Sequence, residues 1–390
     1  MKINLLSTAI SVIALSTSLP TIASDTEQFI ADTNLDFNFR YRAEFVDQDD
    51  TTNKDSALAN TLRSRATLTT GTFKGLSALI EGDNVLHITD DFNDGENGNT
   101  KYDKVIDQET TQLNQVYLQY QGFNSTVKLG NQRINLDNQR HVGGVAFRQD
   151  EATFDAVSIT NNTIDNTTVF LAVANNRNSI KNENLEEDIT LLNVKYAVNP
   201  ELTTTGFYYD IQNLEGTDGN DGTTIGVRAE AKVSDVNIEA ELAQQDQSLS
   251  DSKPLYYHLS AATKVNQLTA KIGFEVLGSD DGKGAFKTPL GTNHKFLGWS
   301  DTYLAGNGNN GIQDLYANLV TNISGVKLVG QLHNFSADKG SADYGTELGF
   351  LAEKNINNYG LSLKVSQFNA TNESGQVDVT KVWLTGMAKF

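Results

Sequence analysis

Four arginines of this chain occur as two Arg-x-Arg pairs, Arg40 with Arg42 and Arg63 with Arg65. Each pair lies in a stretch of alternating polar and apolar residues, and in a strand of this kind residues two apart point the same way. A guanidinium group is always charged in proteins and binds a carboxylate through two parallel hydrogen bonds. On neighbouring antiparallel strands the four arginines would form one basic patch, which in a pore selects anions.

Acidic residues on the same face offer these arginines a second role. Glu44 follows the first pair, and Glu81 and Asp83 occur in the next alternating stretch. Pairing between guanidinium groups and these carboxylates would cancel much of the positive field and simply hold a polar wall together. The sequence leaves both roles open.

Residues for catalysis or for metal binding are sparse. The five histidines show neither an H-x-x-x-H nor an H-E-x-x-H spacing, and no G-x-S-x-G motif is present. The acidic segment 89–103 places Phe92 where a calcium loop needs an oxygen ligand, if Gly95 is its turn glycine. We therefore expect no enzymatic activity, no cofactor and no metal site.

The elements that would position the arginines are β-strands. Period-two alternation recurs from residue 34 to the last residue, and eighteen such segments can be counted. Their approximate centres lie at residues 40, 63, 79, 117, 129, 157, 171, 193, 207, 228, 240, 260, 272, 316, 330, 350, 363 and 384.

The links between these segments alternate in length, nine being long and polar and eight being short. A soluble sandwich has no reason to sort its links in this way, whereas outer-membrane barrels have short periplasmic turns and longer outer loops. Closure of the sheet also removes exposed strand edges. The pattern predicts an all-β fold, a transmembrane antiparallel up-and-down β-barrel of about 18 strands, with both termini on the short-turn side.

The charges indicate which face of the strands is inside. In residues 35–45 the odd positions are apolar, while the even positions include Arg40, Arg42 and Glu44. So many charges cannot fill a dry core, because each would need a partner. We predict that the apolar face contacts lipid and that the charged face lines a water-filled lumen. Outward aromatic residues near strand ends should form the interfacial girdles, among them Phe37, Tyr120, Tyr196 and Tyr359.

The ends and the composition of the chain agree with an exported barrel. Residues 1–24 have the basic start, apolar run and small residues of a signal peptide, which leaves residues 25–390 for the barrel channel. The chain has no cysteine, so no disulfide holds the fold together. Its net charge of −19 argues against nucleic acid as a partner. The last strand ends on Phe390, which resembles the signature that barrels present to their assembly machinery. The expected partners are therefore outer-membrane lipid and that machinery.

Several short motifs, combined with the Arg-x-Arg pairs, resemble the alginate-export family of outer-membrane β-barrel porins. They are G-x-Q at 130–132, "NQRHVG", "FRQ", "TFDA", "TPLGTNHKFLGWSD" and "GIQDLY". The resemblance implies an eighteen-stranded channel with a constriction lined by basic residues. Carried over by position, the lining would be Arg40, Arg42, Arg63, Arg65, Arg133, Arg140 and Arg148, with Lys128 and Arg228 as further candidates.

Taken together, the sequence predicts an outer-membrane porin for hydrophilic, anionic solutes such as alginate-like or other uronate saccharides. Three of the lining candidates, Arg133, Arg140 and Arg148, lie in a long link that could fold into the mouth or the lumen. Two alternatives remain at this point: a non-selective general diffusion porin, and a binding or adhesin barrel that acts through its outer loops.

Overall fold

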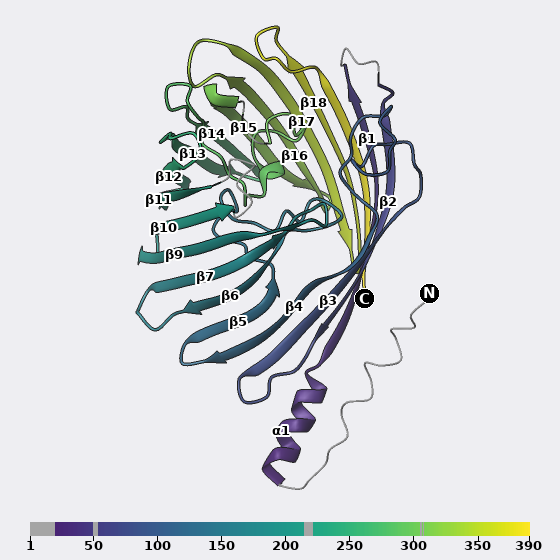
Figure 1. The fold of residues 1–390 in the computed structure, drawn as a ribbon, viewed down its shortest axis with the longest axis vertical. Helices are drawn as coiled ribbons and strands as arrows, with labels where there is room; N and C mark the ends of the chain where they lie inside the picture. Colours follow the sequence, from purple (N-terminus) through teal and green to yellow (C-terminus); the bar gives the residue numbers. More distant parts are fainter. Residues whose placement is uncertain (1–19, 50–53, 214–220, 305, 307) are drawn as a thin grey trace.

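A computed structural model describes residues 20–49, 54–213, 221–304, 306 and 308–390. Most of the predicted signal peptide, residues 1–19, lies outside this part of the chain, so its cleavage stays a prediction. The described chain begins with α1 (Pro20–Ala31), which lies below the barrel in Figure 1. No helix among the described residues is long and apolar enough to cross a membrane.

One antiparallel sheet contains all the described strands. In chain order they are β1 (Asn34–Gln48), β2 (Ala57–Thr69), β3 (Leu76–His87), β4 (Thr110–Gly122), β5 (Ser125–Gln132), β6 (Thr153–Asn161), β7 (Thr167–Asn178), β8 (Asn184–Leu185), β9 (Glu187–Asn199), β10 (Leu202–Asn213), β11 (Gly222–Val233), β12 (Val236–Gln247), β13 (Leu255–Val265), β14 (Leu268–Leu277), β15 (Ile312–Ile323), β16 (Val326–Ser336), β17 (Asp343–Ile356), β18 (Tyr359–Ala370) and β19 (Val379–Lys389). The two-residue β8 extends a long link beside β7, so eighteen strands form the wall.

The sheet closes on itself. Each wall strand pairs with the next along the chain, and β1 also pairs with β19, with Phe45 opposite Val382. In Figure 1 the yellow last strands accordingly lie beside the purple first strand. The carboxyl end completes the seam, because Phe37 and Phe390 exchange two backbone hydrogen bonds of 2.8 and 2.9 Å. The predicted up-and-down barrel is confirmed, and all eighteen predicted centres fall inside wall strands.

The apolar face of the strands points outward. Leu35, Phe37 and Phe39 are exposed on the outer surface, whereas Arg42 and Glu44 are 4% and 1% exposed. The same alternation continues around the barrel. A closed wall with an apolar outer face satisfies every backbone group internally and presents hydrocarbon side chains to lipid. The predicted orientation of the two faces is confirmed.

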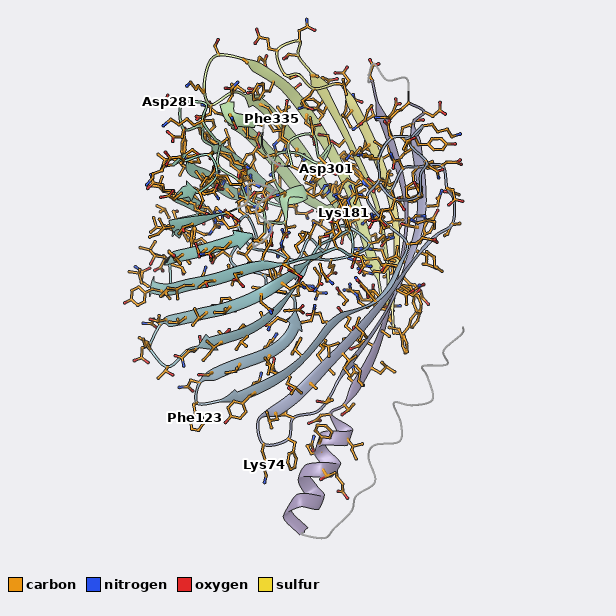
Figure 2. The ribbon with its side chains drawn as sticks, viewed as in Figure 1. Lys74, Phe123, Lys181, Asp281, Asp301 and Phe335 are labelled. Carbon is orange, nitrogen blue, oxygen red and sulfur yellow. The ribbon has the colours of Figure 1, made fainter. Side chains whose placement is uncertain are left out.

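The links are sorted by length as predicted. The short links lie on one rim, where Lys74 and Phe123 are labelled in Figure 2. In the turn between β4 and β5, Phe123 and Asn124 both have a φ of 52°, the left-handed conformation that a two-residue type I′ hairpin requires. Such turns match the twist of the adjoining strands, so little chain is needed on this rim.

Two long links fold into the barrel and narrow it. We call residues 133–152, between β5 and β6, the first inner loop, and residues 278–304, after β14, the second inner loop. Figure 2 places Asp301 of the second loop inside the barrel. The loops contact each other through a parallel bridge between Val142 and Leu290, and the Gly143 amide donates to the Leu290 carbonyl at 2.8 Å. Eighteen strands leave a lumen too wide for wall side chains to fill, so these loops define the passage.

The outward face provides a direct test of membrane contact. Leu259 lies at the middle of β13 and is 59% exposed on the outer surface. We expect Leu259→Arg to lower the free energy of unfolding from lipid vesicles by about 2–4 kcal/mol, the cost of a lipid-facing arginine near the bilayer midplane. Leu249→Arg is the matched control, since Leu249 is equally exposed but lies in an outer loop. Equal effects of the two substitutions would contradict a lipid-facing wall.

Candidate functional site

The two Arg-x-Arg pairs lie side by side, as their spacing predicts. Arg40 is directly opposite Arg63 in the register of β1 and β2. The first inner loop covers them, so that Arg40, Arg42 and Arg63 are only 7%, 4% and 5% exposed. These arginines are therefore buried between the wall and the loop, and they do not line an open bore.

Arg40 holds the loop through neutral oxygen atoms. Its guanidinium donates to the Gln149 side-chain oxygen at 2.8 Å, to the Ala146 carbonyl at 2.9 Å and to the Arg148 carbonyl. Gln149 in turn donates to the Thr61 hydroxyl at 2.8 Å. One guanidinium group therefore holds two backbone carbonyls and one side chain of residues 146–149, because it offers five donors in a planar arrangement.

Arg63 and Arg65 are paired with acids. Arg65 makes a bidentate pair with Asp83, with Nε and Nη2 at 2.6 and 2.5 Å, and lies 2.9 Å from Glu151 of the first inner loop. Arg63 is 3.6 Å from the same Glu151 oxygen. Glu81 is 3.6 Å from Arg65. The pairing role that the sequence left open is thus the observed one for Arg65, and a loop carboxylate joins it.

Arg42 has a different environment. Its guanidinium carbon lies 4.4 Å above the ring of Phe147 and a nitrogen lies 4.0 Å from Asp107. Two of its nitrogens, Nε and Nη1, are buried without a hydrogen-bond partner. A charged group in this state depends on the attraction of nearby carboxylates and on the aromatic face for its stability.

The arginines of the first inner loop hold it against three parts of the barrel. Arg133 contacts Glu81 at 3.1 Å and Glu151. Arg140, which is fully buried, donates to Glu275 of β14 at 2.7 Å. Arg148 reaches Glu44 of β1, 3.0 Å away. The long link that carried these candidates therefore does fold into the lumen.

Asp301 links the two inner loops. Its carboxylate contacts Arg148 of the first loop at 3.2 Å, Lys381 of β19 at 2.9 Å and His294 at 2.5 Å. Burial alone would raise the pKa of Asp301, but the hydrogen bond from His294 and the charges of Lys381 and Arg148 hold it well below its usual range. Arg148 also contacts Glu44 at 3.0 Å. The two loops are therefore joined by ionic contacts as well as by backbone.

His294 is neutral at physiological pH. Burial lowers its pKa to about 3, despite the opposing pull of Asp301. Its ring stacks on Phe147 with centroids 3.5 Å apart, and its Nε2 lies 3.0 Å from the Lys364 ammonium. A neutral imidazole can accept from Lys364 while donating to Asp301, so this contact adds no further cation to the cluster.

The remaining candidates lie apart from this cluster. Arg228 of β11 is surrounded by Glu241 at 2.9 Å and by Glu230 and Glu239 at 3.2 Å each. Lys128 of β5 lies 4.6 Å from the ring of Tyr117 and has no ion pair within the described part of the chain. The structure thus gathers six of the nine candidates, Arg40, Arg42, Arg63, Arg65, Arg133 and Arg148, and leaves Lys128, Arg140 and Arg228 elsewhere.

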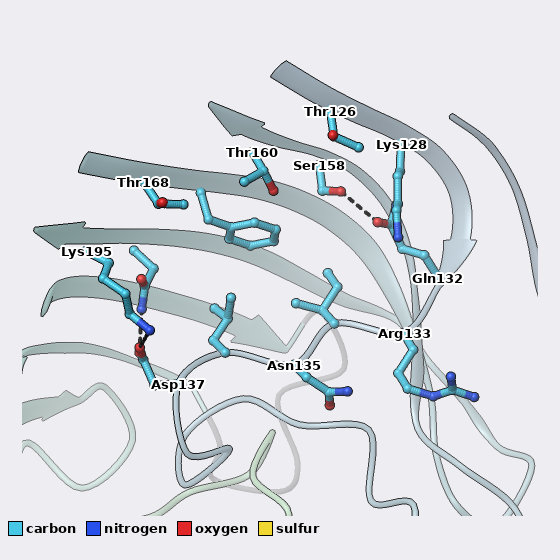
Figure 3. A pocket seen from close by; sticks show the side chains of 14 residues that line it. Thr126, Lys128, Gln132, Arg133, Asn135, Asp137, Ser158, Thr160, Thr168 and Lys195 are labelled. Carbon is cyan, nitrogen blue, oxygen red and sulfur yellow. Dashed lines mark hydrogen bonds and ion pairs between the residues drawn. The ribbon is translucent and has the colours of Figure 1, made fainter. Parts of the chain in front are cut away.

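A cavity of about 460 Å³ lies beneath the first inner loop and carries excess positive charge; we call it the basic cavity. Lys128, Arg133 and Lys195 line it, and Asp137 is the acid among its lining residues. Figure 3 shows Lys195 directed at Asp137, 3.2 Å away. Sequence reasoning missed Lys195 and Asp137, although Lys195 has the inward parity of β9 between Val194 and Tyr196.

Comparisons with known proteins bear on the fold. The sequence matches no protein-family model and no curated protein. Its structure is similar to that of Pseudomonas aeruginosa OccK3 (OpdO), with a TM-score of 0.72, 11% identity and coverage of 95% of this chain and 98% of the other. The structure of Acinetobacter baumannii OccAB4 is similar with a TM-score of 0.72 and 10% identity, and the match covers 92% of this chain and 98% of the other. For the outer membrane protein OpdK of P. aeruginosa the TM-score is 0.71 and the identity 12%, and the match covers 93% of this chain and 99% of the other.

These similarities show that the chain shares the barrel fold of these proteins over nearly its whole length. The predicted location in the outer membrane agrees with that fold. They support the porin architecture expected from the sequence without singling out alginate export.

Asp150 makes the packing of the first inner loop sensitive to pH. Burial raises the pKa of this loop carboxyl to about 7, and the nearby carboxylate of Asp83 adds to the effect. Between pH 4 and 7 Asp150 therefore holds a proton only while the loop is packed, so raising the pH across that window destabilises the packed loop. We expect current fluctuations of single channels to increase as the pH rises towards 7 and to level off above it.

Asp150→Asn should remove this pH dependence, because the amide is neutral at every pH. Asp165→Asn is the control, since Asp165 is an exposed residue of a short turn. Fluctuations that stay constant from pH 5 to 9 in the unmodified protein, or that persist in Asp150→Asn, would contradict a role for this carboxyl.

Proposed function

We propose that this protein is an outer-membrane porin through which hydrophilic solutes diffuse, with a preference for anions. The observation that carries the proposal is a closed barrel whose lumen is narrowed by two inner loops, with the basic cavity beneath one of them. Lys128, Arg133 and Lys195 line this cavity, and Asp137 is the acid among its lining residues. Arg133 is also paired with Glu81 and Glu151. A pore lined by excess lysine and arginine favours anions.

The buried arginines have a different part in this proposal. Arg65 and Arg148 are compensated by carboxylates at 2.5–3.2 Å, so their fields are largely cancelled. They fix the shape of the passage by holding the first inner loop against the wall. In the basic cavity Arg133 is paired with Glu81 and Glu151, and Lys195 with Asp137, but their side chains remain 24% and 40% exposed to water. Lys128 has no ion pair within the described residues. We assign the selectivity to these cations.

The resemblance noted in the sequence suggests the finer substrate class, anionic saccharides such as alginate-like uronates. A uronate carries one carboxylate on each sugar ring, and a guanidinium or ammonium group can replace part of the water around that carboxylate. A general diffusion porin and an adhesin barrel are the alternatives, and the experiment below distinguishes all three. Chemistry at a catalytic centre has no part in the proposal.

Selectivity can be measured as the reversal potential across planar bilayers under a potassium chloride gradient. We expect Lys128→Gln combined with Lys195→Gln to lower the ratio of chloride to potassium permeability by about fivefold, because one charge at about 4 Å contributes ~1 kcal/mol even in bulk water. Lys181→Gln is the control, since Lys181 is an exposed residue of the long link between β7 and β9. Little change in the double variant would indicate a general porin, and an absence of conductance would indicate a binding barrel.

We also propose that the carboxyl-terminal residue is read by the barrel assembly machinery. Phe390 is 58% exposed, and its ring lies against Phe39 and Tyr359 at 6.4 and 6.1 Å. Phe390→Ala should reduce the fraction of barrel inserted in cells, measured by its altered electrophoretic mobility on heating. Tyr359→Ala removes the same ring contact without altering the terminus, so equal losses in both variants would assign the effect to packing.

A further inference from the structure

A second cavity lies beneath the second inner loop, on the opposite side of the barrel from β1 to β4. It encloses about 410 Å³, which is within the range of about 300–1,000 Å³ typical of small-molecule sites. Strands β12 to β16 form its wall and residues 296–299 of the loop cover it. We call it the aromatic cavity, because Phe296, Trp299 and Tyr316 all contribute to its lining.

The wall of the aromatic cavity carries a row of polar side chains at one height. In the strand register Lys271 is opposite Asn318, Asn318 is opposite Gln331, and Gln331 is opposite Gly349. On the same face, Tyr316 donates or accepts a hydrogen bond of 2.9 Å with His258 Nε2. Neighbouring strands therefore present two amides, a phenol and an imidazole to one small volume.

The covering segment is held in place by the wall. The buried Glu347 carboxylate accepts hydrogen bonds from the backbone amides of Trp299 and Ser300. Gly298 has a φ of +80°, and a Cβ there would overlap that carboxylate, so this turn requires glycine. The ring of Trp299 packs where Gly349 has no side chain. Trp299 is thus positioned before any ligand arrives.

The charged groups of the aromatic cavity already have partners. Glu275 accepts from Arg140 at 2.7 Å, Asp314 contacts His333 at 2.8 Å, Glu239 contacts Lys271 at 3.4 Å, and Lys295 donates to the Asn138 carbonyl at 3.0 Å. A free amine or a free carboxylate would have to displace one of these pairs. The charges of this cavity therefore do not favour an ionic ligand.

The groups without a partner are neutral. Gln331 Nε2, His258 Nδ1 and Asn318 Oδ1 are buried and make no hydrogen bond to the described residues. Gln331 and His258 are 8% and 7% exposed, so water has little access to them. Leaving such a polar atom unpaired costs about 1–3 kcal/mol, which a ligand hydroxyl can recover. Neutral donors and acceptors beside aromatic rings suit a molecule that carries hydroxyl groups and an apolar face.

We propose that the aromatic cavity is a binding subsite for a pyranose ring. The apolar C–H face of the sugar would lie against Trp299 or Tyr316, and its hydroxyl groups would bond to Gln331, His258 and Asn318. The subsite deepens the proposed function and rests on it: the aromatic cavity recognises the ring of a saccharide, while the basic cavity favours its carboxylate. A small molecule without hydroxyl groups should bind poorly, because it would leave these atoms unpaired.

The chain offers a specific probe of this subsite. It contains two tryptophans, Trp299 in the cavity and Trp383, which is 1% exposed. In a Trp383→Phe background the fluorescence of the folded barrel reports on Trp299 alone. We expect cellobiose to change this fluorescence in a saturable way, and Gln331→Ala to weaken its apparent affinity at least tenfold. Gln119→Ala is the matched control, an inward glutamine of β4 on the other side of the barrel.

A second measurement does not depend on the tryptophan background. Cellobiose added to the unmodified channel in a bilayer should produce transient reductions of current, and these should be lost in Gln331→Ala and kept in Gln119→Ala. Saturable binding of choline or glutarate without binding of cellobiose would overturn the sugar subsite, as would the absence of any effect of cellobiose in both measurements. Anion selectivity is measured without sugar, so the proposed function can stand where this subsite fails.

Discussion

The bilayer is the constraint on which the rest of this structure depends. Hydrocarbon offers no partner for backbone groups or for charges, so the wall must close and its outer face must be apolar. The charged residues near the middle of these wall strands are consequently directed inward, where Arg40, Arg63 and their neighbours are crowded together. The inner loops pack over these charges only because they bring matching groups, such as Glu151 and Asp301. The passage is therefore shaped by ionic pairing inside a wall that lipid has oriented.

The wall could be predicted from the sequence because its signal is local. Side chains alternate with a period of two, and a one-residue slip would place the charges of β1 in lipid. The predicted neighbourhood of Arg40 and Arg63 is correct for the same reason, since consecutive strands of an up-and-down barrel pair in order. The lengths of the links also predict which rim of the barrel carries the tight turns. Phe123 and Asn124 adopt the left-handed backbone that a two-residue hairpin on this rim requires.

The interior could not be predicted in the same way. Arg148 meets Asp301 across 153 residues of sequence, and Arg140 meets Glu275 across 135. No periodicity encodes such contacts, which depend on how two irregular loops pack. The candidates were identified by residue type, inward parity and family resemblance, and the fold covers four of them, Arg40, Arg42, Arg63 and Arg65, with the first inner loop. Lys195 was missed although the alternation of β9 directs it inward. The basic cavity that it lines forms only when the first inner loop folds into the barrel.

Contacts between the two inner loops connect the basic cavity to the aromatic cavity. The Val142–Leu290 bridge and the contact between Arg148 and Asp301 mean that neither loop can move far without breaking bonds of the other. Arg148 and Asp301 are both almost completely buried, and leaving either charge unpaired would cost several kcal/mol. Thermal motion therefore does not readily open one cavity alone. A solute in the passage meets a rigid frame, so discrimination between solutes must come from the groups that line each cavity, the cations of one and the neutral amides and rings of the other.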